Sequence, residues 1–402
     1  MAVILQPLVP FFRLTPLRNE WQDVELNTPL DALYLNGDKS AFKRALKAFK
    51  KDGGLKGYRL ASHESIDKVM DEIAQLDPGQ ISPSLYESYS ENLRKAVDQV
   101  FKKDNGNGLS DQLRANVSKF AAYKAYNATN DIQREMGNDW EDAKMVLRTY
   151  NRYQTTEYNT TVSRCRTAKQ FDQFNDPDNR RLFPNLRWLP SRSADPRESH
   201  MLFYDRVWSK DDEFWTKNTP GSLWNCKCDW EETDDPVTDG NPTTGKSMSG
   251  LKGNPAMTGD VFSEDHPYCD NRMWNDVKSN IRDITRSDND TLYKKYRIKG
   301  FGDVLVDNIS YIEASKGSSS DSSYFVKLEL LNGIDKYIKK LSYVGSETIE
   351  LSNKNKNNIF FKRKRNFSQM DIYSIKIGAF DFILKFGKFK KDGSLHLYSI
   401  TG

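Results

Sequence analysis

The sequence of 402 residues predicts an α+β fold, in which long helices lead into a tryptophan-rich mixed core and a small C-terminal domain of helix and antiparallel strands. Apolar residues recur at helical spacing between 82 and 175, whereas residues 372–401 alternate as β-strands do. Between these regions, 187–228 combines four tryptophans with a histidine and two cysteines. The predicted regions are an N-terminal arm with short helices (1–80), a central domain (81–276, with helices in 82–175 and its core in 180–235), a connector and linker (277–317), and a basic C-terminal domain (318–402).

Composition indicates a folded protein of polar character. Aromatic residues make up 12% of the chain, which argues against disorder, because disordered chains lack large rings to bury. The mean hydropathy of -0.76 is nevertheless strongly polar, and it indicates elongated or partner-covered segments beside compact ones. The four cysteines are irregularly spaced, which fits a reducing cytoplasm better than a disulfide scaffold.

The chain begins with an apolar stretch, MAVILQPLVPFF, that has no basic residues and is interrupted by Pro7 and Pro10. This pattern does not fit a signal peptide, and it is too short to span a membrane. We therefore expect no membrane partner. The stretch is instead predicted to dock on another subunit, with packing on its own domain as the alternative.

Charge is distributed unevenly along the chain. The net charge is +4, yet residues 318–402 contain fifteen Lys and Arg against eight Asp and Glu. The tail therefore carries +7 and the remaining chain carries -3. A basic tail on a near-neutral body indicates a separate module with a polyanionic partner, and a solvated lysine-rich surface is the alternative.

Three long helices are predicted in the first part of the central domain. Ser82 and Pro83 supply an N-cap and a proline for the first turn, and apolar residues follow at helical spacing through Phe101. A second helix is predicted to begin at Ser110, and a third to run over about 138–171. Antiparallel packing of such helices would bury their stripes of Leu, Val, Tyr and Phe.

The core of the central domain carries an ordered set of unusual residues. Prolines and short apolar alternations in this region favour small strands and loops over helices. Indole rings bury much surface, so the default role of the tryptophans is packing. The members of the set, in chain order, are Arg187-Trp188, Arg197-x-x-His200, Phe214-Trp215, Pro220-Gly221 and Trp224-Asn225-Cys226-Lys227-Cys228.

This ordered set resembles the phage Mu F-like head morphogenesis family, the minor head proteins that accompany the portal in tailed bacteriophages. The resemblance covers roughly residues 110–275 and is specific as a set. It implies portal and head proteins as partners, and a location in the virion and in the cytoplasm of the bacterial host. One departure is Phe203-Tyr204-Asp205-Arg206, where the family usually has a turn of Leu-Asp-Gly type. The motif residues with an implied structural role are Arg187, Trp188, Arg197, His200, Trp215, Trp224, Asn225, Cys226 and Cys228.

Cys226, Cys228 and His200 are candidate zinc ligands, because zinc binds thiolates and imidazole. His266 and Cys269 are further candidates for the same site. However, a Cys-x-Cys pair is tighter than the usual Cys-x-x-Cys knuckle, and buried thiols in a Trp-rich core need no metal. We therefore expect no cofactor, with zinc as the alternative, and expect His200 to fix the loop geometry through a backbone or Asp partner.

The C-terminal domain offers a candidate catalytic face. A short helix near 328–341 is predicted to precede strands at 372–377, 380–386 and 394–401, which are joined by tight turns. Strict alternation would place His396 on the face opposite to Ser399 and Thr401. A metal-free ribonuclease needs an acid, a base and cations near the phosphate, and an ordinary exposed strand histidine is the alternative. The candidate catalytic residues are His396, Lys376, Lys385, Ser399 and Thr401, and the candidate nucleic-acid-binding residues are Lys362, Arg363, Lys364 and Arg365.

The β-meander that ends in Leu-Tyr-Ser-Ile-Thr resembles the small toxin domains of the barnase, EndoU and colicin ribonuclease group, which many Mu F-like proteins carry at the C-terminus. This resemblance implies a metal-independent ribonuclease in 318–402, with RNA (tRNA) or DNA and an immunity protein as partners. The predicted function is therefore a minor head protein of a tailed bacteriophage or prophage that acts at the portal in head morphogenesis and carries an RNA-cleaving effector. The alternative is a purely structural protein whose basic domain binds nucleic acid without catalysis.

Overall fold

The computed structural model of the chain contains helices and two β-sheets, which confirms the predicted α+β class. Its elements fall into two compact units, one of residues 1–75 and 131–149 and the other of 76–130 and 150–402. In the described part, no helix is long and apolar enough to cross a membrane. The structure describes residues 63–101, 108–193, 196, 198–243, 245, 247–287, 293–298, 302–314, 320–349 and 363–402.

The first unit contains α5 (His63–Ala74), the end of α7 (Leu109–Met136) and most of α8 (Trp140–Arg152). Apolar residues at helical spacing are buried on both α5 and α8. Lys144 of α8 forms an ion pair with Asp67 of α5 at 3.0 Å. The apolar arm that the sequence predicts at the start of the chain lies outside the described residues.

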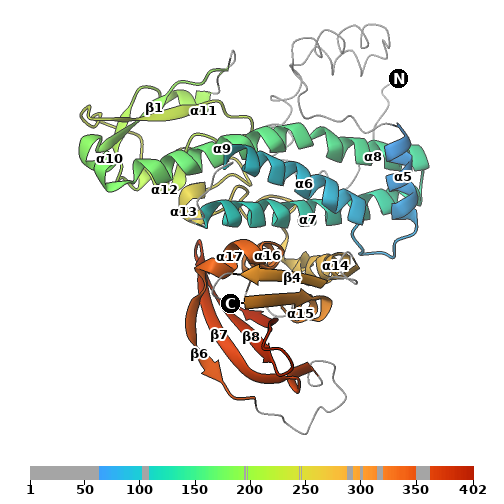
Figure 1. The fold of residues 1–402 in the computed structure, drawn as a ribbon. Coiled ribbons are helices and arrows are strands. Elements are labelled where there is room, and N and C mark those ends of the chain that lie inside the picture. The colour runs from blue at the N-terminus through green and yellow to red at the C-terminus, as the bar shows by residue number, and fades with distance from the viewer. Residues whose placement is uncertain are drawn as a thin grey trace. The chain divides into compact units, whose positions relative to one another are not determined.

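Three helices that lie side by side form the first part of the second unit: α6 (Pro83–Val100), α7 and α9 (Gln154–Phe174) (Figure 1). The predicted start of α6 is confirmed, because the Ser82 hydroxyl accepts a hydrogen bond from Leu85 N and Pro83 lies in the first turn. The apolar positions at the predicted helical spacing are buried. These helices form the scaffold that carries the Trp-rich core.

The region predicted as one helix over 138–171 is two helices. α8 ends at Arg152 and α9 begins at Gln154, so a single residue, Tyr153, separates them. Tyr153 keeps a right-handed helical conformation, and its carbonyl oxygen accepts a hydrogen bond from Glu157 N. A junction this short leaves the apolar periodicity almost unbroken, which is why the sequence pattern indicates one helix.

α7 and α9 are joined by a fully buried ion pair. Lys124 Nζ lies 2.6 Å from Glu157 Oε2, and neither side chain is more than 2% exposed. The same Nζ lies 4.5 Å from the centre of the Tyr89 ring on α6. Burial lowers the pKa of Lys124 and raises the pKa of Glu157, because each charge has lost its hydration. Since desolvation offsets much of the attraction, we infer that the pair orients the three helices more than it stabilises them.

The Trp-rich core is built on a small antiparallel sheet with strand order β2-β1-β3. Its strands and short helices are β1 (Asn185–Leu189), α11 (Glu198–Met201), β2 (Val207–Ser209), α12 (Phe214–Lys217) and β3 (Asp229–Thr233), preceded by α10 (Pro177–Leu182) and followed by α13 (Pro255–Thr258). Trp188, Trp208 and Trp215 pack with Phe203 and Phe214 in one buried cluster. The predicted preference of 180–235 for small strands and loops is confirmed.

The C-terminal sheet has six strands among the described residues, in the order β4-β5-β9-β8-β7-β6. The predicted meander is confirmed by its last three strands, of which β7 and β8 are long and bent (Figure 1). Gly378 and Gly393 have the left-handed conformations that the predicted tight turns require. The strands are β4 (Tyr293–Ile298), β5 (Gly302–Asp307), β6 (Ser342–Glu347), β7 (Phe367–Ile377), β8 (Phe380–Phe389) and β9 (Leu395–Thr401).

The sheet begins before the predicted domain boundary at Ser318. β4 and β5 lie within 277–317, which the sequence assigns to a connector and linker, and β5 pairs in parallel with β9. A partner strand so far along the chain leaves no local sequence signal, which explains the difference. The accompanying helices are α14 (Trp274–Ser287), α15 (Asn308–Ala314), α16 (Asp321–Asn332) and α17 (Ile334–Tyr337).

Candidate functional site

His200 is held rigidly on the short helix α11. Its side chain is 2% exposed, and its ring meets Trp188 edge to face with the ring centres 5.1 Å apart. His200 Nε2 lies 3.1 Å from the hydroxyl of Ser222. When Nε2 carries the proton and donates it to this hydroxyl, Nδ1 presents a lone pair to a ligand. Ser222 therefore fixes the orientation of the imidazole, and the partner of His200 is a serine hydroxyl instead of the predicted backbone or Asp group.

The two cysteines lie on a loop that α9 fixes. Asn225 N donates a hydrogen bond to Thr160 Oγ1 at 3.1 Å, and Ser163 Oγ donates one to Cys226 O at 3.3 Å. Asn225 has a left-handed backbone conformation, with φ of 56°, which Asn adopts more readily than most residues. Asn225 therefore turns the chain sharply just before the cysteine pair.

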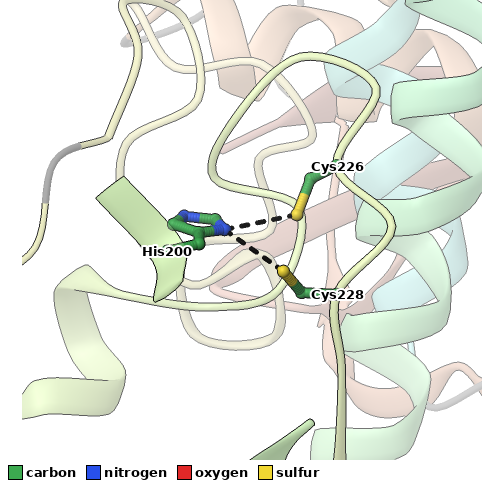
Figure 2. Close-up of side chains that lie close together, drawn as sticks. All are labelled: His200, Cys226 and Cys228. Carbon is green, nitrogen blue, oxygen red and sulfur yellow. Dashed lines mark hydrogen bonds between the residues drawn. The ribbon is translucent and has the colours of Figure 1, made fainter. Parts of the chain in front are cut away.

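The three candidate ligands meet at one point (Figure 2). His200 Nδ1 lies 3.4 Å from Cys226 Sγ and 3.5 Å from Cys228 Sγ, and all three atoms lie within 4.8 Å of one another. With zinc–sulfur and zinc–nitrogen bonds of ordinary length, a tetrahedral site separates nitrogen from sulfur by about 3.6 Å. The two nitrogen–sulfur distances therefore fit a tetrahedral zinc site.

The charges of the two thiols are coupled. The Cys228 thiol and His200 lower the pKa of Cys226, whereas the Cys226 thiolate and burial raise the pKa of Cys228. The indole N–H of Trp188 and the hydroxyl of Tyr204 lie beside the Cys228 sulfur and partly oppose this rise. Ionisation of one thiol therefore opposes ionisation of the other, and a divalent metal would favour both thiolates.

His266 and Cys269, the further candidates from the sequence, lie outside this group among the residues that the structure describes. His266 Nδ1 accepts a hydrogen bond from Tyr268 N at 3.1 Å, and its ring packs against Phe120 and Trp224. Burial lowers its pKa to about 3, so the ring is neutral. His266 is a packed core histidine.

The remaining motif residues support the site at different distances. Trp188 and Trp215 stack in the buried aromatic cluster with ring centres 6.3 Å apart, whereas Trp224 stacks on Phe262. Arg187 lies at the surface, where it forms ion pairs with Glu231 and Asp235. Arg197 lies outside the described residues.

The turn that departs from the family pattern is held by Asp205. Its φ is 59°, a left-handed value more common for Gly, and Asp205 N donates a hydrogen bond to Trp188 O at 2.9 Å. Asp tolerates this conformation better than most residues other than Gly. The chain can therefore make a sharp turn next to Trp188 without a glycine.

Arg164 of α9 joins the loops around the site, and no pattern in the sequence singles it out. Its side chain is fully buried, and burial lowers its pKa to about 10, which leaves the guanidinium charged at neutral pH. The carbonyl groups that it binds come from loops far apart in the sequence. The acceptors of its hydrogen bonds, at 3.0 to 3.4 Å, are the main-chain oxygens of Gly221, Leu251, Lys252, Gly253 and Asp260.

The carboxyl group of Asp260 is largely removed from water. Its Oδ1 accepts a hydrogen bond from Asn116 Nδ2 at 2.7 Å, and burial raises its pKa to about 6. Because the pKa in the folded state lies above its value of about 3.9 in unfolded chains, protonated Asp260 favours folding. This contribution is complete below the unfolded pKa and is lost as the pH rises through the folded pKa.

We therefore expect Asp260→Asn to be more stable than the wild type at pH 7.5 by about 1 to 2 kcal/mol, and to match it near pH 4. Asparagine keeps the oxygen that accepts from Asn116 but carries no charge to bury. Urea unfolding of both proteins between pH 4 and 7.5 measures the difference. A stability difference that does not change between these pH values would contradict the assignment.

A β-bulge at Tyr398 changes which side chains share a face of β9. Gly387 pairs with His396, Phe386 with Leu397 and Lys385 with Ser399, so Tyr398 is the extra residue of β9 at this point. The predicted strict alternation is wrong at this point, because an inserted residue moves all later side chains to the opposite face. His396 and Ser399 therefore share a face with Lys385.

The bulge brings the candidate catalytic residues to one half-exposed face of the sheet. Lys376, however, is opposite Asp381 at the end of β8 that is remote from His396, and Lys385 forms an ion pair with Glu347 at 2.8 Å. Burial lowers the pKa of His396, whose Nε2 lies 3.2 Å from the Ser394 hydroxyl. The residues on this face are His396, Lys376, Lys385, Ser399 and Thr401.

The basic cluster does not form one cationic surface. Arg363 is buried, and it bonds to Asp307 at 3.2 Å, Ser310 at 2.9 Å and the Leu397 oxygen at 3.2 Å. Its charge is therefore directed inward. Lys364 is half-buried and Arg365 is exposed, while Lys362 lies outside the described residues.

Comparisons with protein-family models, with curated proteins and with solved structures find no significant match to this chain. The family resemblance therefore depends on the ordered motif residues themselves.

Proposed function

We propose that this chain is a minor head protein of a tailed bacteriophage or prophage, and that its Trp-rich core folds around a zinc ion. One observation carries the proposal. Trp188, His200, Cys226 and Cys228, which the family resemblance singles out and which are spread over the core sequence, meet at one buried point. A structural role at this point explains why the motif combines tryptophans with metal-ligand residue types.

His200, Cys226 and Cys228 would hold the ion. Bound zinc would supply a positive charge that lets both thiols ionise, and it would link α11 to the cysteine loop. The Ser222 hydroxyl would support His200 from behind, as hydrogen-bonded neighbours do in zinc sites. A zinc ion that connects α11 to the cysteine loop would stabilise the Trp-rich core, because its strands β1, β2 and β3 are short.

In the head, the chain would act by forming interfaces at the portal, without turnover, and it would be located in the virion and in the host cytoplasm. The test is to isolate particles from a host that carries the gene together with its neighbours. We expect the chain to co-purify with the portal, and Cys228→Ser to reduce its incorporation. A chain that is absent from particles, and from portal complexes in the lysate, would overturn the proposal.

The second part of the proposal is a nucleic-acid function of the C-terminal face, with cleavage of RNA as the sharper form and binding alone as the alternative. The grouping of His396 with Ser399, Thr401 and Lys385 on one face favours it. Expression of the full chain should arrest growth, and His396→Ala should relieve the arrest. If growth is normal while the purified chain binds RNA or DNA in a salt-sensitive way, binding without catalysis is the function. If the chain neither arrests growth nor binds nucleic acid, both the cleavage proposal and the binding proposal are overturned.

A further inference from the structure

α16 is buried on all sides. Every residue from Ser323 to Leu331 is buried, including the charged residues Lys327 and Glu329. Its first turn is fixed by Ser320, whose hydroxyl accepts a hydrogen bond from Ser323 N. A helix that is buried all round lies within a core instead of on a surface. α16 therefore needs partners on opposite sides.

On one side, α16 contacts the helices of the central domain. Glu329, whose side chain is 7% exposed, receives two hydrogen bonds from the guanidinium of Arg94 on α6, at 2.6 and 3.0 Å. Lys119 of α7, which is 2% exposed, donates to Ser322 Oγ at 3.0 Å and lies 3.4 Å from Asp321 Oδ2. A bidentate guanidinium–carboxylate pair fixes direction as well as distance.

On the other side, α16 contacts the C-terminal sheet. Lys327 Nζ donates a hydrogen bond to the main-chain oxygen of Ile400 in β9 at 3.2 Å. The turn between β7 and β8 also meets α7, where the Gln112 side chain lies so close to Gly378 that no Cβ would fit. Both regions belong to the same compact unit. The sheet is therefore joined to the helices by specific contacts.

We propose that α16 is a docking helix that holds the C-terminal sheet on α6 and α7 through two ion pairs, so that the sheet keeps its His396 face available while docked. The pairs are Arg94 with Glu329 and Lys119 with Asp321. A sheet docked in this way differs from the separate basic module behind a linker that the sequence predicts. A nucleic-acid ligand of this face would bind without undocking. The inference depends on the contacts of α16, and not on the proposed role in a phage head.

The test is a charge swap in the full-length protein, followed by hydrogen–deuterium exchange of α16 and β9. Arg94→Glu and Glu329→Arg should each speed amide exchange in both elements by about tenfold or more, because a buried charge is left without its partner. The double variant should recover most of the protection. Rescue by the reversed pair is a result that loss of packing alone would not produce.

Lys95→Glu is the matched control, because Lys95 forms an exposed pair with Glu91 on the same helix. We expect exchange in α16 to be unchanged by it. If a charge reversal prevents folding, Arg94→Met and Glu329→Gln replace it, with the same expected direction. The docking role would be overturned if amide exchange in α16 and β9 stays at the wild-type rate in all single variants. It would also be overturned if the double variant with the reversed pair recovers no protection from exchange.

Discussion

Replacement of Cys228 by serine is expected to lower the melting temperature of the central domain strongly and to remove its sensitivity to chelators. The zinc tetrahedron would lose one of its three protein ligands, and a hydroxyl is a poor ligand in its place. Metal binding to the folded chain contributes directly to folding free energy. We expect a loss of about 3 kcal/mol or more at neutral pH. Thermal unfolding with and without a zinc chelator, followed by tryptophan fluorescence, measures it.

Cys269→Ser is the control for this experiment, because Cys269 lies outside the ligand group among the described residues. It should leave the chelator effect intact. Cys226→Ser should resemble Cys228→Ser, since both sulfur atoms lie at similar distances from His200 Nδ1. Equal melting temperatures for wild type and Cys228→Ser, with no effect of the chelator on either, would show that the thiols act by packing alone.

Replacement of Arg164 by alanine should be among the most destabilising single changes in the second unit. The change removes the donor to all of the main-chain oxygens that Arg164 binds, and the bonds to the oxygens of Gly221 and Leu251 are buried. We expect a loss of about 3 to 5 kcal/mol in the free energy of unfolding. Arg164→Lys should recover part of this loss, because an ammonium group donates fewer and differently directed hydrogen bonds. Urea unfolding compares the variants.

Arg166→Ala provides the matched control on the same helix, because Arg166 is exposed. Its effect should stay within about 0.5 kcal/mol. The effect of Arg164→Ala should also reach the group of His200, Cys226 and Cys228, since Gly221 lies on the segment that leads to Cys226. A loss below about 1 kcal/mol for Arg164→Ala would mean that the loops do not depend on this residue.

Much of the fold could be predicted from local sequence signals. The cap at Ser82, the helical spacing that follows it and the tight turns at Gly378 and Gly393 act over a few residues, so they are visible in the sequence. The Trp-rich region was predicted to form small strands and loops for a similar reason, because its prolines interrupt any helix. These features are found where local chemistry decides the conformation.

The features that the sequence could not predict depend on long-range contacts. β4 and β5 are joined to the meander by the pairing of β5 with β9, and Arg164 binds loops from distant parts of the chain. The bulge at Tyr398 depends on the pairing of β9 with β8, and it reversed the predicted faces. For the candidate site, the residue types were sufficient to name His200 and the two cysteines. Their spacing could not decide between packing and metal binding, because that choice depends on distances in space.

The central claim is that His200, Cys226 and Cys228 hold one zinc ion, and native mass spectrometry of the full-length chain, purified without added metal or chelator, tests it most directly. The claim predicts a mass that exceeds the polypeptide mass by one zinc ion, which is lost on acidification and is absent from Cys228→Ser. The claim would be contradicted if the wild-type protein is folded but has the mass of the bare polypeptide. In that case its mass would also stay unchanged after incubation with zinc.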